Sequence, residues 1–86
     1  MTHSVILSSG AGRELRKLDP PTAARIVRTL EVLADSPRPP AAKPLVGRPE
    51  VWRVRTGDYR VLYEIDNDVL VVLVIRIAHR SRVYER

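Results

Sequence analysis

Arginine is the residue type in this sequence that is best suited to chemistry. Of the 86 residues, 15 are lysine or arginine, and among them only Lys17 and Lys43 are lysines. The planar guanidinium donates two parallel hydrogen bonds to a phosphate group and stays charged at any working pH. Against ten acidic residues these side chains leave a net charge of +5. The sequence therefore predicts a polyanionic partner, either a nucleic acid or an acidic protein that covers the same surface.

Four arginines occupy segments in which side chains alternate as in β-strands. They are Arg53, Arg55, Arg60 and Arg76. Because successive side chains point to opposite faces of a strand, Arg53 and Arg55 share a face. By the same alternation, Arg76 is expected on the face of Val72 and Val74. One orientation of the sheet then brings all four arginines to a single open face, away from the helices. A solvated sheet face is the alternative for any one arginine, whereas four like charges together favour an anion site.

A second group of candidate residues follows the last predicted strand. Arg80 and Arg82 are further phosphate-binding candidates, and His79 is a candidate for substrate contact or proton transfer. The alternative for His79 is a structural or solvated role. Tyr84 lies among these arginines, where it can stack on an unpaired base or, alternatively, cap the sheet. Glu64 is the only carboxylate expected on the arginine-bearing face, where it balances charge rather than acting as a base.

Several classes of protein are excluded by composition. The absence of cysteine excludes a disulfide scaffold, a cysteine nucleophile and thiolate-bound zinc. The two histidines are not spaced as metal ligands, and no glycine-rich phosphate loop is present, so neither a metal nor a cofactor is expected. The longest apolar run, 69–75, has seven residues, whereas a membrane helix needs about 20. No signal peptide is recognisable, and we expect a cytoplasmic protein that does not associate with membranes.

The chain has room for one domain, residues 1–86, whose first half is helical. Val5 to Leu7 suit a short first strand. Ser9 is expected to cap a short amphipathic helix, and Asp19 a second helix whose first turn holds two prolines. The second helix ends where the proline-rich segment 36–40 begins. The two helices are expected to form a hairpin that covers a flat surface.

The second half has the period of β-strands. Residues 36–49 contain prolines that exclude a helix or a central strand, so an irregular connection is expected there. Strands are expected over 51–55, 59–65 and 69–78, and a last extended piece over 81–86. Trp52, Tyr59 and Tyr63 are expected in the core. The fold class is therefore α+β with the order β-α-α-β-β-β, a small, largely antiparallel sheet with a helical hairpin packed on one face.

Two stretches of sequence carry a resemblance to a known family. WRVRTGDYRVLY at 52–63 is followed by a turn, an apolar strand and AHRSRVY at 78–84. With these stretches the chain resembles the RelE branch of the RelE/ParE toxin superfamily over nearly its whole length. The resemblance implies the toxin of a type II toxin-antitoxin system, held inactive by a cognate antitoxin. We expect the open arginine face to receive an extended antitoxin segment with acidic and apolar side chains.

The resemblance also implies roles for individual residues. Arg60 matches the phosphate-binding arginine of the family, Arg80 the arginine that stabilises the charged transition state, and Tyr84 the tyrosine that orients the nucleotide. Arg53 and Arg55 stand where the RelE branch often has lysines. Because arginine does not release its proton, these two residues can hold phosphate but are poor general bases.

The activity that the resemblance implies is a metal-independent endoribonuclease, an mRNA interferase. It would enter the A site of the small ribosomal subunit and cut mRNA there by attack of a ribose 2′-OH on the adjacent phosphate, which inhibits translation. Two alternatives remain open at this point. One is a ParE-like inhibitor of DNA gyrase, and the other is a non-catalytic RNA- or protein-binding module of the same fold.

Overall fold

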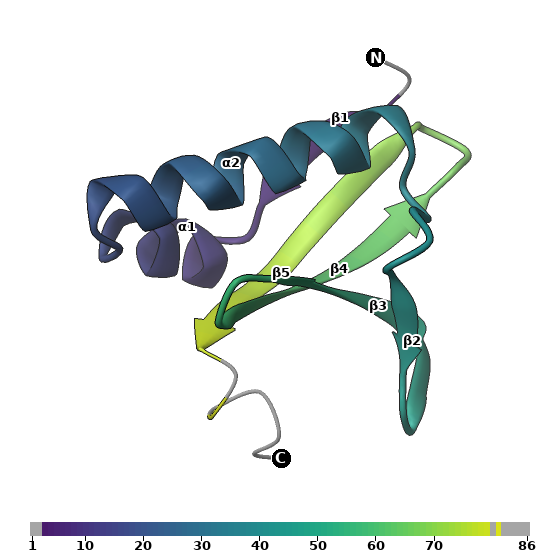
Figure 1. Cartoon of the computed structure of the whole chain (residues 1–86). Coiled ribbons are helices and arrows are strands. Elements are labelled where there is room, and N and C mark those ends of the chain that lie inside the picture. Colours follow the sequence, from purple (N-terminus) through teal and green to yellow (C-terminus); the bar gives the residue numbers. More distant parts are fainter. Residues whose placement is uncertain (1–2, 80, 82–86) are drawn as a thin grey trace.

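In the part of the chain that the structure describes, a five-stranded sheet and two helices make up the fold (Figure 1). The computed structural model describes residues 3–79 and residue 81. The elements are β1 (Ser4–Leu7), α1 (Ser9–Arg16), α2 (Pro20–Asp35), β2 (Lys43–Leu45), β3 (Arg48–Thr56), β4 (Tyr59–Asp66) and β5 (Val71–His79). The strand order is β1-β5-β4-β3-β2, in which β1 and β5 are parallel and all other pairs are antiparallel. The α+β class, the largely antiparallel sheet and the helices packed on one face are confirmed.

The prediction of an irregular connection over 36–49 is wrong in its second half. That segment contains β2, and β3 begins at Arg48 instead of Val51. β2 lies at the edge of the sheet, where Pro44 is tolerated because an edge strand need not donate on its outer side. Gly47 has a φ of 85°, which lets the chain turn between the two strands. The element order is therefore β-α-α-β-β-β-β.

The helix caps lie close to the predicted positions. The N-cap of α1 is Ser8 rather than Ser9, and its Oγ accepts the Ala11 N–H at 3.0 Å. Asp19 caps α2 as predicted, with a carboxylate oxygen that accepts the Thr22 N–H at 3.2 Å. Hydrogen bonding with the Thr22 side chain, and then with its backbone N–H, lowers the pKa of Asp19. Pro20 and Pro21 then occupy the first turn, where no intrahelical N–H is needed.

The last strand is shorter than predicted, because Val69 and Leu70 belong to the turn that precedes it. Leu70 has a φ of 55°, in the left-handed region that a strand cannot use. β5 therefore begins at Val71 and extends to His79. Within the described part of the chain, no helix is long and apolar enough to span a membrane.

The core lies between the helices and one face of the sheet. Its fully buried side chains come from both helices and from β3, β4 and β5, and the largest are Tyr63, Ile26, Leu33, Ile77, Val51, Val61, Val72 and Val74. Trp52 and Tyr59 are half-buried and pack against this cluster. The Arg38 guanidinium lies 5.4 Å from the centre of the Trp52 ring. The predicted core roles of the three aromatic residues are confirmed.

Tyr63 provides a test of this core at high pH. Its hydroxyl donates to the Pro37 carbonyl at 2.6 Å, and burial raises the pKa of Tyr63 to about 12. A raised pKa means that the folded state keeps a proton that the unfolded chain loses near pH 10, so stability is lost as pH rises from 10 to 12. Two pKa units correspond to about 3 kcal/mol.

We expect the Tyr63→Phe substitution to reduce this alkaline loss by most of that amount. At pH 7 the variant should be less stable by about 1 kcal/mol, because the Pro37 carbonyl loses its donor. Urea unfolding at pH 7, 10 and 12 measures both effects. Equal pH dependence of the two proteins would contradict the assignment of this loss to Tyr63.

Candidate functional site

The four strand arginines share the face of the sheet that the helices do not cover. Arg55 is paired with Arg60, and both Arg53 and Arg76 are paired with Leu62 from opposite sides. Directly paired residues project to the same face of a sheet. The other face carries Val61 and Tyr63, which are fully buried against the helices. We call the surface formed by Arg53, Arg55, Arg60 and Arg76 the arginine face.

A bulge in β5 is what brings Arg76 to this face. The register of β4 and β5 shifts between Leu62 and Tyr63, so that Leu62 pairs with Arg76 and Tyr63 pairs with Val74. Ile75 is the extra residue. Arg76 therefore lies on the other face of the sheet from Val72 and Val74, which are fully buried. The expectation that these three residues share a face is wrong. Strict alternation fails here because an inserted residue reverses the order of faces.

The four arginines differ in how far they reach the solvent. Arg55 is exposed and Arg53 is half-buried. Arg60 is only 4% exposed, so it departs from the open, solvent-facing position expected from the sequence. Because Arg55 and Arg60 are direct cross-strand neighbours, their like charges repel each other. A bound anion would lower this repulsion, which makes the arginine face a candidate phosphate-binding surface.

Glu14 of α1 is a part of the site that the sequence did not reveal. One of its oxygens accepts the Ile77 N–H at 2.7 Å, and the other accepts from Arg76 Nε at 3.4 Å. Among the described residues, Glu14 rather than Glu64 is therefore the carboxylate that pairs with Arg76. Glu14 stands on a short helix 62 residues away from Arg76 in the chain, so no local spacing could reveal the contact.

His79 lies on the other face from Arg60. It is paired with Tyr59, and the two rings meet edge to face with centres 5.5 Å apart. Together with Glu14, Arg76 and Ser81, these residues line a hollow of about 530 Å³ at the end of β5. The structure thus brings His79 near Arg76 but not onto the arginine face.

The hydrogen bonds of His79 limit its chemistry. Its Nδ1 accepts the Ser81 N–H at 3.3 Å and lies 3.1 Å from the Ser81 hydroxyl. A backbone N–H can only donate, so in the neutral ring the proton is on Nε2. In this arrangement His79 offers a hydrogen-bond donor to a substrate, not a free base.

Three of the predicted site residues lie outside the described residues. They are Arg80, Arg82 and Tyr84. Among residues 3–79 and 81, no three histidine, aspartate or glutamate side chains are grouped so that they could hold a metal ion.

The chain is similar to known toxins in both sequence and structure. A family model described as the ParE toxin of type II toxin-antitoxin system, parDE, matches residues 5–84. Toxin RelG of Mycobacterium tuberculosis is 35% identical over 91 residues, which cover 100% of each chain. The mRNA interferase toxin RelE of Escherichia coli K12 is 30% identical over 84 residues, 95% of this chain and 87% of that toxin.

Solved toxin-antitoxin complexes share the fold. The RelBE2 complex of Mycobacterium tuberculosis matches with a TM-score of 0.81 and 32% identity, over 93% of this chain and 100% of that one. The intact RelBE complex of Escherichia coli matches with a TM-score of 0.80 and 26% identity, over 98% and 99% of the two chains. The likeness extends over nearly the whole of this chain.

Proposed function

Because this chain belongs to the RelE/ParE superfamily of toxins of type II toxin-antitoxin systems, we propose that it is an mRNA interferase that acts on the ribosome. The observation that carries the proposal is the arginine face in a chain that is 30% identical to an mRNA interferase over 95% of its length. A row of guanidinium groups suits the phosphates of a single RNA strand.

The proposed reaction is an internal transfer within the RNA. The ribose 2′-oxygen attacks the adjacent phosphorus, the bond to the 5′-oxygen breaks, and the products are a 2′,3′-cyclic phosphate and a 5′-hydroxyl. The proton of the 2′-OH passes to a group of the RNA or the ribosome, and the leaving 5′-oxygen takes up one proton from water in return. Arg60 and Arg80 neutralise the charge that develops on the phosphoryl oxygens, and Arg53, Arg55, Arg76 and Arg82 hold neighbouring phosphates.

Proton transfer in this proposal does not depend on the arginines. A guanidinium keeps its proton, so Arg53 and Arg55 act as phosphate clamps. Tyr84 orients the nucleotide, and His79 supplies a donor from Nε2. Because the described residues offer no strong base at the arginine face, alignment of the mRNA by the ribosome supplies much of the rate. Cleavage of free RNA should accordingly be slow.

The proposed partners follow from the same assignment. A toxin of this class needs a cognate antitoxin, and the solved structures that this chain resembles are toxin-antitoxin complexes. The ribosome and its mRNA are the proposed targets, which places the activity in the cytoplasm.

Primer extension on cellular mRNA after brief expression of the chain tests the proposal. We expect discrete cuts in translated regions, phased with the codons, and none in the same RNA when it is not translated. A second candidate function is inhibition of DNA gyrase, favoured by the match to a family model named for ParE. A DNA damage response without mRNA cuts would support that function and contradict ours, and the absence of both would indicate a non-catalytic binding module.

Arg53 and Arg55 allow binding to be separated from proton transfer. Lysine at both positions should keep most of the cleavage activity, because the positive charges remain. Alanine at both should weaken ribosome binding. The slope of the logarithm of the binding constant against the logarithm of the salt concentration should become about two smaller in magnitude, since each lost phosphate contact contributes about one. Binding of purified ribosomes at several salt concentrations measures this slope.

Arg28, exposed on α2, is the matched control for these variants. Arg28→Ala should leave the salt slope at the wild-type value. A double alanine variant with an unchanged slope would show that Arg53 and Arg55 do not contact phosphate.

A further inference from the structure

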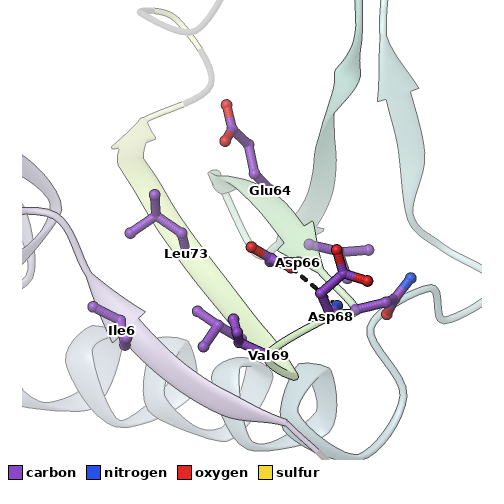
Figure 2. A pocket seen from close by; sticks show the side chains of 9 residues that line it. Ile6, Glu64, Asp66, Asp68, Val69 and Leu73 are labelled. Carbon is purple, nitrogen blue, oxygen red and sulfur yellow. Dashed lines mark hydrogen bonds between the residues drawn. The ribbon is translucent and has the colours of Figure 1, made fainter.

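A hollow of about 550 Å³ lies at the other end of the sheet face that carries the arginines (Figure 2). Ile6 of β1 and Glu64 of β4 are both paired with Leu73 of β5, so these three side chains form a row across the uncovered face. Figure 2 shows this row together with Asp66, at the end of β4, and Val69, in the turn that follows.

The floor of the hollow is apolar and open to solvent. Ile6 is 49% exposed and Val69 is 65% exposed, although both are large hydrophobic side chains. Leu73 and Val71, which are half-buried, continue the same surface. Apolar side chains gathered in a solvent-open hollow are typical of a surface that a partner covers.

The rim of the hollow is acidic, unlike the rest of this basic chain. Glu64, Asp66 and Asp68 line it, and Asp66 Oδ1 accepts the Asp68 N–H at 3.0 Å. Three of the ten acidic residues of a chain with a net charge of +5 are thus collected at one place. Carboxylates repel RNA phosphates, so this end of the face does not suit the substrate. The complementary partner is a protein segment with basic and apolar side chains.

We propose that this hollow, defined by Ile6, Glu64, Asp66, Asp68, Val69 and Leu73, is a docking site for an antitoxin segment in which lysine or arginine alternates with leucine-like side chains. The inference rests on the proposed function for the identity of the partner. Apolar side chains of the segment cover Ile6, Val69 and Leu73, and its cations face the three carboxylates.

This site gives the antitoxin an anchor for which RNA does not compete. RNA phosphates compete with an acidic antitoxin segment for the arginine face. They do not compete with a basic segment for the acidic hollow. Two linked anchors raise the effective concentration of each segment at its own site. The antitoxin therefore stays attached while its inhibitory segment exchanges with RNA.

Short synthetic peptides test the docking site on the full chain. Fluorescence anisotropy measures the binding of three labelled peptides that alternate lysine with leucine, lysine with serine, and glutamate with leucine. We expect the lysine-leucine peptide to bind about tenfold more tightly than the lysine-serine peptide, because only its leucine side chains can cover Ile6, Val69 and Leu73. Asp66→Asn with Asp68→Asn should weaken the lysine-leucine peptide by about tenfold. The amide oxygen of asparagine at position 66 can still accept the backbone N–H of position 68, so the turn is preserved.

The control variant is Arg53→Ala with Arg55→Ala. It should weaken the glutamate-leucine peptide and leave the lysine-leucine peptide bound. Unchanged binding of the lysine-leucine peptide to the double asparagine variant would overturn the docking site, and so would equal affinity for the lysine-serine peptide.

Cleavage on programmed ribosomes separates this inference from the proposed function. The double asparagine variant should cut mRNA at the wild-type rate. If that variant folds but loses cleavage, the hollow serves the ribosome and the inference is wrong. If the wild-type chain does not cut at all, the proposed function fails, and the peptide measurements still decide whether the hollow binds a basic, apolar segment.

Discussion

Substitution of Arg80 by alanine is expected to abolish growth inhibition by this chain. In the proposed reaction the Arg80 guanidinium stabilises charge on the phosphoryl oxygens in the transition state. Removal of one such donor costs about 100-fold to 1,000-fold in rate. Single-turnover cleavage on programmed ribosomes measures the loss directly, and growth after induction measures its consequence in cells.

The control for Arg80→Ala is Arg28→Ala, which also removes one positive charge but from the exposed side of α2. It should keep both cleavage and toxicity. The circular dichroism spectrum and unfolding midpoint of Arg80→Ala should match those of the wild type. A normally folded Arg80→Ala protein that still stops growth would refute the assigned catalytic role.

The largest expected effect on stability comes from Leu33→Ala. Leu33 is fully buried on α2, in the cluster that joins this helix to the sheet. Truncation of a buried leucine costs about 2 to 5 kcal/mol, from lost apolar transfer energy and the remaining cavity. Domains have a total stability of about 0.05 to 0.15 kcal/mol per residue, so this loss is a large part of the whole.

Val32→Ala is the matched control, because Val32 is the preceding residue of α2 and is 52% exposed. The free energy of unfolding of this variant, measured with urea, should be within about 0.5 kcal/mol of the wild-type value. Equal destabilisation by the two substitutions would contradict the position of the core between α2 and the sheet. Loss of toxicity in Leu33→Ala should follow from unfolding, whereas loss in Arg80→Ala should occur in a folded protein.

Local features of this sequence determine most of its secondary structure. Asp19 followed by two prolines specifies a helix start, because the carboxylate accepts an orphan N–H and proline needs no partner in the first turn. The alternation of Arg53 and Arg55 with apolar neighbours assigns the faces of β3, because side chains alternate along any extended strand. The family resemblance also depends only on residue order, in the stretches 52–63 and 78–84. These features need no knowledge of distant contacts.

Tertiary structure decided which residues meet at the site. The bulge at Ile75 put Arg76 on the other face of the sheet from Val72 and Val74. The pairing of β4 with β5 put His79 beside Tyr59, on the face that does not carry Arg60. Such choices depend on register, which is set by contacts between strands and not within them.

Contacts between distant segments decided the rest. Glu14 reaches Arg76 and Ile77 across more than 60 residues of chain. The apolar floor of the hollow depends on the position of β1 beside β5, which brings Ile6 next to Leu73 and into one row with Glu64. β2 formed in a proline-rich segment because it could pair with β3 at the sheet edge. The partners of Glu14 and Ile6 lie far away in sequence, so no local pattern contains these two contacts. The partner of β2 is the next strand of a hairpin, which the prolines of this segment concealed.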